Sequence, residues 1–337
     1  ILEEIHNSSM IRNLAKYIIR NLIRSIRLPA QIIVYWLSAY FPRNQKIWVF
    51  GCWMGNAFRG NSKFFFLYVR KYHTNIRAVW ITKNKELYFK LKKQGIDVCY
   101  ASSFEGYLIS LRSKYFFVSH GVSDICAFLS RRGIIINLSH TIYHIKGLKK
   151  PRPKSLRQKI GPYLVNPFIL FIKPDYAITS SNHTRSITER SYNIREDQVI
   201  EVGTPKTDFL LSPNNADFYL ANEETIKEWA DFRGKKLILF LPTWRSDPNF
   251  DLFGFGFDLQ RINALLERIN AILILNVNPL RQVAHSVPEL NESDNLRYCS
   301  YGGNEMNQLL CKADALITDY SSLFADFLVY NRPIVFA

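Results

Sequence analysis

The chain has 337 residues, 47% of them hydrophobic, and its 44 Lys and Arg outnumber 28 Asp and Glu, giving a formal net charge of +16. This length and composition exclude a single ordinary domain, because the chain can bury two full cores. The positive charge predicts an acidic partner: a phosphate-rich substrate, an anionic membrane surface or a nucleic acid.

The cysteines argue against a zinc or dithiol redox centre. They are odd in number, widely spaced and never arranged as C-x-x-C. We therefore expect buried thiols in a reducing compartment, at Cys52, Cys99, Cys126, Cys299 and Cys311.

The first predicted element is a basic amphipathic helix over residues 11–27. Apolar residues recur there at helical spacing, and the other face carries Arg12, Lys16, Arg20, Arg24 and Arg27. This pattern is typical of a helix lying in the interface of an anionic membrane. The apolar run Ala30–Phe41 that follows is too short to span a bilayer, which needs about twenty residues. We predict that residues 1–42 associate with a membrane; the alternative is that these helices only pack on the first domain.

From residue 46 onward, short apolar runs alternate with helical patterns, as in βαβ units of parallel sheets. Six candidate strands predict one doubly wound domain: Lys46–Phe50, Ile76–Ile81, Ile96–Tyr100, Tyr115–Ser119, Gly133–Leu138 and Asp175–Thr179. Five more predict a second sheet: Gln198–Val202, Lys236–Leu241, Ala271–Val277, Asp314–Thr318 and Pro333–Phe336. The sequence therefore predicts an α/β fold of two Rossmann-like domains, over residues 43–195 and 196–337.

Ligands of open α/β sheets bind at the carboxyl ends of strands, so the residues after each predicted strand are candidates for the site. His120 and His140 each follow a strand of the first domain, and His144 comes four residues later. A histidine there can act as a general base on a substrate hydroxyl, because its ordinary pKa lies near neutrality. The alternative is a hydrogen-bonded structural histidine.

The segment after these histidines is strongly basic. It has seven cations within residues 146–159 and no acid: Lys146, Lys149, Lys150, Arg152, Lys154, Arg157 and Lys159. Such a segment can hold a polyanionic acceptor or lie against an anionic membrane, or it can be a solvated loop.

Strand ends of the second domain carry groups suited to a diphosphate, namely Gly203, Thr204, Lys206, Thr243, Arg245, Asp319, Ser321 and Ser322. In the run Asp319–Ser322, a strand leads directly into a helical pattern. Backbone N–H groups, two hydroxyls and the positive end of a helix dipole then point to one place. The alternative is that the two serines only cap the helix.

The segments FLPTWR and LITDYSSLFADFLVYNRPIVF resemble signature segments of the CDP-glycerol glycerophosphotransferase family, and weaker similarity extends over residues 46–337. The resemblance implies a GT-B architecture of two Rossmann-like domains with the active site in the cleft. It implies a peripheral enzyme at the cytoplasmic face of the membrane, acting in teichoic acid or capsule synthesis. Such enzymes transfer glycerol phosphate or ribitol phosphate from a CDP-activated donor to a hydroxyl of a lipid-linked acceptor and release CMP.

The resemblance also implies residue roles. His140 best matches the family's general base, with His144 and His120 as further candidates. Thr243, Arg245, Ser321 and Ser322 would hold the diphosphate, and Asp319 would order the turn. The chain has no D-x-D motif, so we expect no tightly bound cofactor or metal, although a Mg²⁺ shared loosely with the donor stays open. We expect no nucleic-acid partner, because no motif supports one.

Two features depart from the family pattern. Where the family usually has Lys-x-His-Pro, this sequence has Asn276 and Asn278. Asn can donate a hydrogen bond to a leaving phosphate but supplies no positive charge and no proton, and we keep Asn278 as a candidate donor-binding residue. His140 is followed by Thr141 rather than Gly. Two alternatives therefore remain: a GT-B glycosyltransferase that uses a nucleotide sugar, and a catalytically silent membrane-bound scaffold. Since GT-B chains normally continue past their last strand, we expect the sequence to be truncated at its C-terminus.

Overall fold

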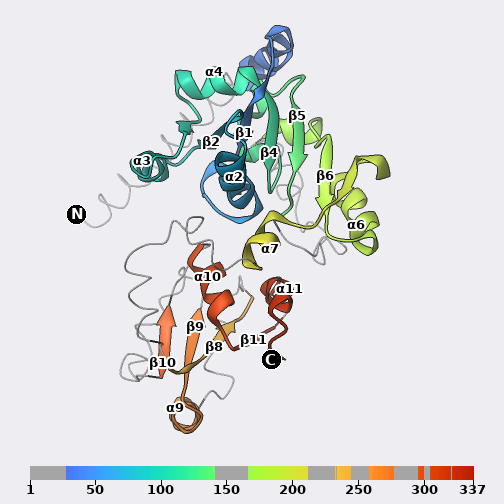
Figure 1. The fold of residues 1–337 in the computed structure, drawn as a ribbon. Helices are drawn as coiled ribbons and strands as arrows, with labels where there is room; N and C mark the ends of the chain where they lie inside the picture. Colours follow the sequence, from blue (N-terminus) through green and yellow to red (C-terminus); the bar gives the residue numbers. More distant parts are fainter. Residues whose placement is uncertain are drawn as a thin grey trace, which may run out of the picture.

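The computed structural model describes residues 28–140, 166–211, 232, 234–243, 258–276, 295–299, 304–319 and 321–337. Within these ranges the chain forms two parallel β-sheets, of seven and five strands, with helices packed beside them (Figure 1). The predicted α/β architecture of two doubly wound sheets is therefore confirmed.

The first sheet has the strand order β3-β2-β1-β4-β5-β6-β7. Its strands are β1 Asn44–Phe50, β2 Arg77–Thr82, β3 Val98–Tyr100, β4 Ser113–Val118, β5 Ile134–Asn137, β6 Tyr176–Thr179 and β7 Val199–Glu201. The accompanying helices are α2 Gly60–Tyr72, α3 Lys85–Lys93, α4 Phe104–Arg112, α6 Asn182–Tyr192 and α7 Pro205–Leu210. The strand order reverses between β1 and β4, so ligands are expected at the carboxyl ends of these strands.

The second sheet has the order β10-β9-β8-β11-β12. Its strands are β8 Lys236–Leu241, β9 Ala271–Asn276, β10 Leu296–Cys299, β11 Ala315–Thr318 and β12 Ile334–Phe336, and the described helices are α9 Leu259–Arg268, α10 Asn304–Lys312 and α11 Leu323–Phe327. The order reverses between β8 and β11, which makes their carboxyl ends the corresponding ligand position.

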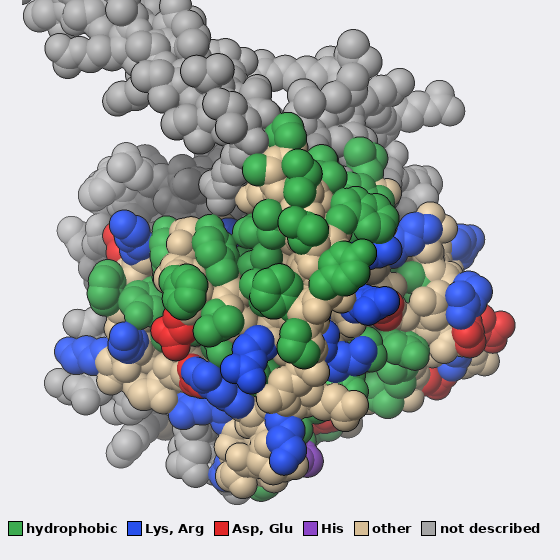
Figure 2. All heavy atoms as spheres, turned by 90° about the horizontal axis from the view of Figure 1, so that it is seen from above, with side chains coloured by type: hydrophobic (Ala, Val, Ile, Leu, Met, Phe, Trp, Pro, Cys, Tyr) green, Lys and Arg blue, Asp and Glu red, His purple; other side chains and the backbone are tan. Residues whose placement is uncertain are grey.

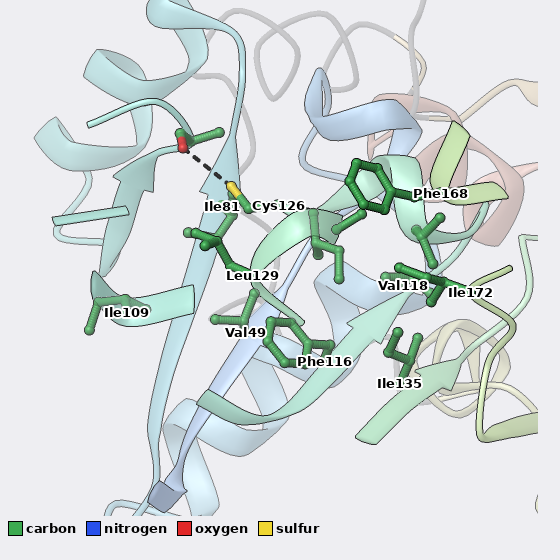
Figure 3. Packing of buried hydrophobic residues seen from close by; sticks show 14 of the residues in the cluster. Val49, Ile81, Ile109, Phe116, Val118, Cys126, Leu129, Ile135, Phe168 and Ile172 are labelled. Atoms are coloured by element: carbon green, nitrogen blue, oxygen red, sulfur yellow. Dashed lines mark hydrogen bonds between the residues drawn. The ribbon is translucent and has the colours of Figure 1, made fainter. Parts of the chain in front are cut away.

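Both faces of the first sheet are buried. Val49 of β1 and Phe116 of β4 are fully buried in the cluster shown in Figure 3, where the Cys126 thiol donates to the Ala101 carbonyl oxygen at 3.2 Å. The next residue of β1, Phe50, points to the opposite face and packs in the cluster that α2 covers. Burial on both faces explains why these strands are continuous apolar runs rather than alternating ones.

One strand was assigned to the wrong sheet. The run Gln198–Val202 was predicted to open the second sheet, but β7 pairs in parallel with β6 and closes the first. Because α6 connects β6 to β7, a right-handed crossover places β7 beside β6. The first sheet therefore extends beyond residue 195. Strand β10, a short edge strand that contains a charged residue, was not predicted.

The predicted amphipathic helix, residues 11–27, lies outside the described residues. Residues 28–37 are helical and lead into η1, Ser38–Tyr40. Tyr35 is buried and packs on Phe168, whereas Trp36 and Leu37 are exposed. This helix thus packs on the first domain with one face only. Among the described helices, none combines the length and the apolar character that crossing a bilayer requires.

The carboxyl ends of the two sheets face each other. In Figure 1 the arrowheads of β4, β5 and β6 point toward the second sheet, and the arrowhead of β10 points toward the first. Helices α7 and α11 lie between the two sheets (Figure 1). The strand ends that are predicted to carry the site therefore belong to two facing edges.

Candidate active site

Two histidines meet at the carboxyl edge of the first sheet. His120 follows β4 and His140 follows β5, and these strands are neighbours in the sheet. The two imidazole rings are stacked, with centroids 4.4 Å apart and an interplanar angle of 20°. His140 is exposed, whereas His120 is half-buried. His140 is therefore the more accessible ring of this pair.

The buried carboxylate of Asp124 fixes the position of His120. Its oxygens accept the backbone N–H groups of Met54 at 2.7 Å, Ser119 at 2.9 Å and His120 at 2.8 Å. Burial raises the pKa of Asp124, and these hydrogen bonds oppose the rise. A Cβ on Gly51 would lie 2.3 Å from the Asp124 carbonyl oxygen, so this glycine is required by close packing. Asp124 thus joins the loop after β1 to the loop after β4.

The environment of His120 keeps its ring neutral. Burial lowers its pKa to about 4, and the nearby His140 and Arg59 contribute in the same direction. The rings of Trp53 and His120 form a T-shaped pair with centroids 5.3 Å apart, and the Arg59 guanidinium lies 3.4 Å from the centroid of Trp53. A neutral His120 places no positive charge beside the exposed ring of His140.

A second cluster forms at the carboxyl edge of the second sheet, where β8 and β11 are neighbours. One carboxylate oxygen of Asp319 accepts the backbone N–H of Thr243 at 2.8 Å, the Thr243 hydroxyl at 2.5 Å and the backbone N–H of Ser321 at 3.0 Å. The ends of both strands are thereby held in one turn. The turn presents hydroxyl groups directly before α11.

The structure tests whether the serines of this turn, Ser321 and Ser322, only cap the helix that follows. Helix α11 begins at Leu323, and the side chain of its N-cap residue, Ser322, makes no capping hydrogen bond. Ser322 is exposed. Its side chain therefore does not cap α11 in this structure, so the capping alternative does not hold for Ser322.

The residues after β7 have partners inside the protein. Gly203 has a φ of +74°, and the Thr204 hydroxyl accepts the backbone N–H of Thr207 at the start of α7. The Lys206 ammonium forms an ion pair with Asp326 of α11 at 2.5 Å, and both side chains are buried. Thr204 and Lys206 were predicted as donor-binding residues, and the structure engages both of them in holding α7.

Four predicted positions cannot be placed by their side chains. His144, Arg245 and Asn278 lie outside the described residues, and Asn276 is described only as the last residue of β9. In the described part of the chain, no three His, Cys, Asp or Glu side chains come together as metal ligands. The expectation that no metal is tightly held stays a prediction.

Sequence reasoning missed three buried polar residues that organise the site: Asn61, Asp124 and Asp326. Asp326 is a single acid within the apolar helical pattern after the two serines, and it is only 3% exposed. A lone acid in an apolar pattern is a readable signal, because a buried carboxylate requires a partner. The identity of that partner, 120 residues earlier in the chain, is not readable.

A cavity of about 680 Å³ lies between α2, α7 and strands β4 to β7. Its wall is mostly aromatic and aliphatic and includes Phe64, Tyr68, Phe117, Ile178 and Phe209. The described wall contains no Lys or Arg, so the cavity is unsuited to a diphosphate. The two facing strand edges remain the candidate site.

Comparison with known proteins agrees with this architecture. The model of the family described as CDP-Glycerol:Poly(glycerophosphate) glycerophosphotransferase matches residues 33–337. The teichoic acid poly(glycerol phosphate) polymerase of Bacillus subtilis (strain 168) is 28% identical over 329 residues, which cover 90% of this chain and 40% of that protein. The chain thus spans well under half the length of that relative.

Solved structures show the same fold. The wall teichoic acid polymerase TagF superposes with a TM-score of 0.69 at 21% identity, covering 93% of this chain and 76% of that one, and a variant of it soaked with CDPG gives 0.67. The UDP-GlcNAc 2-epimerase from Neisseria meningitidis superposes with a TM-score of 0.53 at 12% identity, covering 86% and 81%. The GT-B-like fold is confirmed, and the chain belongs to the CDP-glycerol:poly(glycerophosphate) glycerophosphotransferase family.

Proposed function

We propose that the chain transfers a polyol phosphate, glycerol phosphate in the first instance, from a CDP-activated donor to a hydroxyl group of a lipid-linked acceptor. The single observation that carries this proposal is that the carboxyl edges of the two sheets face each other in a chain that belongs to this family. One edge presents the exposed His140 against a neutral His120. The other presents the turn that Asp319 orders.

In the proposed reaction, His140 takes the proton of the acceptor hydroxyl while the oxygen of that hydroxyl attacks the β-phosphorus of the donor. The new oxygen–phosphorus bond forms as the bond from that phosphorus to the bridging oxygen breaks, and the bridging oxygen leaves with CMP. Reactions of this kind depend mainly on positioning and on stabilisation of charge. The hydroxyls of Ser321 and Ser322 would hold the diphosphate, together with Arg245 and the amide of Asn278. The Thr243 hydroxyl, which donates its proton to Asp319, would order the turn beside them.

A nucleotide-sugar transferase is the less favoured candidate, because the epimerase likeness, at 12% identity, supports a shared fold only. The test is release of nucleotide from CDP-glycerol, CDP-ribitol and several nucleotide sugars, each with a lipid-linked acceptor. We expect CMP from a CDP-polyol, and we expect His140→Ala to abolish it. Release from a nucleotide sugar alone would contradict the proposal. Release from no donor would favour the silent scaffold.

We also propose that the protein attaches peripherally to an anionic membrane surface at the cytoplasmic face. One face of the molecule gathers exposed hydrophobic side chains with Lys and Arg around them (Figure 2). The large hydrophobic residues that are exposed in the described chain include Ile33, Trp36, Leu37, Tyr40, Phe41, Ile169, Leu170 and Phe171. The Arg131 guanidinium lies 4.3 Å from the ring centroid of Trp36. Exposed apolar side chains beside cations suit the boundary between lipid headgroups and acyl chains.

Vesicle co-sedimentation tests this attachment. The chain should bind vesicles that contain anionic lipid more strongly than neutral ones, and added salt should weaken the binding. Equal recovery in the supernatant with both vesicle types would contradict it.

A further inference from the structure

We propose that Asn61, Lys206 and Asp326 are positioning residues that hold the His140 edge of the first sheet in register with the Asp319–Ser322 turn of the second. The inference rests on the proposed transfer function of this site. It gives Lys206 a role different from the donor contact that the sequence predicted. The three residues form a continuous polar connection from one edge to the other.

The first link joins Asn61 to the turn that carries His140. The Asn61 amide donates to the carbonyl oxygens of Leu138 at 2.8 Å and Ser139 at 2.9 Å. Its carbonyl oxygen accepts the backbone N–H of Lys206 at 3.1 Å. Asn61 is 2% exposed, so these contacts do not compete with bulk water. One side chain thereby fixes both the histidine turn and the start of α7.

The second link anchors α7 to the first domain. Phe209 of α7 stacks on Phe64 of α2, with ring centroids 4.3 Å apart and an interplanar angle of 25°. Leu210 is fully buried. Helix α7 is thus part of the same packed unit as the histidine turn. A contact that holds Lys206 therefore also holds this unit.

The third link crosses to the second sheet. The Lys206 ammonium pairs with the Asp326 carboxylate, and the two side chains are 10% and 4% exposed. Burial raises the pKa of Asp326, and Lys206 opposes the rise. Asp326 belongs to α11, the helix that begins directly after the Asp319–Ser322 turn. Figure 1 shows α7 and α11 next to each other between the two sheets.

A buried ion pair is a poor source of net stability, because desolvation of both charges offsets their attraction. Its geometry is nevertheless specific, since either charge alone in that position is strongly unfavourable. Transfer requires the acceptor oxygen and the phosphorus to meet at about 3–3.5 Å, and an error of about 1 Å costs roughly a hundredfold in rate. A link that fixes α11 relative to α7 therefore acts on the catalytic step.

The test replaces the pair with apolar side chains of similar size, in the double variant Lys206→Met/Asp326→Leu. Such replacements commonly preserve folding. We expect an unchanged thermal midpoint and an unchanged Kd for CDP-glycerol, with kcat for transfer reduced by about a hundredfold. The matched control is Arg195→Met/Asp197→Leu, which removes an exposed ion pair and should alter none of these values.

Hydrogen–deuterium exchange provides a readout that does not depend on activity. In the double variant, exchange should accelerate in peptides that contain residues 323–327. Peptides that contain residues 138–140 should exchange as in wild type, because their contacts with Asn61 remain. Unchanged exchange in residues 323–327, or an unchanged kcat, would overturn the positioning role. A Kd for CDP-glycerol raised more than tenfold in the double variant would also overturn it, because Lys206 would then contact the donor. If wild-type protein releases no CMP, the proposed function fails, and the exchange experiment still tests the link.

Discussion

His120 is predicted to make the folded state lose stability as the pH falls. Its pKa is lowered from 6.5 to about 4 by burial, with His140 and Arg59 contributing. Because the folded-state pKa lies below the unfolded-state value, the unfolded chain binds a proton more readily between these two pH values. The contribution of His120 to stability is therefore fully present above pH 6.5 and is lost as the pH falls through 6.5 toward 4.

The magnitude follows from the two pKa values. A difference between 6.5 and about 4 corresponds to about 3 kcal/mol in full, at about 1.4 kcal/mol for each pH unit. Roughly two thirds of this contribution to the free energy of unfolding is lost between pH 7 and pH 4.5. The ring is only half-buried, so screening by water reduces the expected effect to about 1–2 kcal/mol.

The assay is urea unfolding at pH 7, 5.5 and 4.5 for wild type, His120→Asn and the control His73→Asn, which changes an exposed histidine. Asp124 and the other carboxyl groups titrate in all three proteins, so the difference between proteins isolates His120. Wild type and the control should lose about 1–2 kcal/mol more than His120→Asn across this range. Parallel losses in all three would refute the assigned environment of His120.

Four further substitutions test the remaining contacts. Asp124→Ala should lower the free energy of unfolding by about 3 kcal/mol or more, because three backbone N–H groups lose a buried acceptor, and urea unfolding measures this. Ser322→Ala should change the thermal midpoint little, since its hydroxyl does not cap α11, yet it should raise the KM for donor. Asp319→Ala should raise the KM for donor further by loosening the turn, as steady-state kinetics would show. Leu37→Glu should weaken co-sedimentation with anionic vesicles and leave unfolding unchanged.

Each of these expectations has a definite contrary result. Unchanged unfolding of Asp124→Ala would mean that the three N–H groups find other acceptors. A loss of about 0.5–2 kcal/mol in Ser322→Ala would restore the capping role. An unaltered KM in Asp319→Ala would separate the turn from the donor. Undiminished vesicle binding by Leu37→Glu would exclude this face from membrane attachment.

Short apolar runs in the sequence predicted most of the strands, because strands that are buried on both faces must be apolar along their whole length. The same argument could not assign β7 to a sheet, since the pattern of Val199–Glu201 is equally compatible with either one. It missed β10 because Arg297 interrupts a run of four residues. The crossover connection from β6 decides the place of β7, and the edge position of β10 allows a charged residue in that strand. Both are properties of the folded chain.

The candidate site was predictable in its chemistry and not in its internal contacts. His140 and Asp319 follow strands, so the expectation that ligands bind at carboxyl ends selected them directly. The stacking of His120 on His140 depends on the exact register of β4 and β5. The pairing of Lys206 with Asp326 depends on how the two sheets are packed together. Long-range packing of this kind leaves no local pattern in the sequence.

The central claim is that one edge activates the acceptor and the other holds the donor. Transfer of labelled glycerol phosphate from CDP-glycerol to a lipid-linked acceptor tests it most directly, with His140→Ala compared against Ser321→Ala/Ser322→Ala. The account predicts that the histidine variant loses kcat and keeps the wild-type Kd for donor, whereas the serine variant mainly raises that Kd. A histidine variant that retains wild-type kcat, or a serine variant that binds the donor normally and transfers at the wild-type rate, would contradict it.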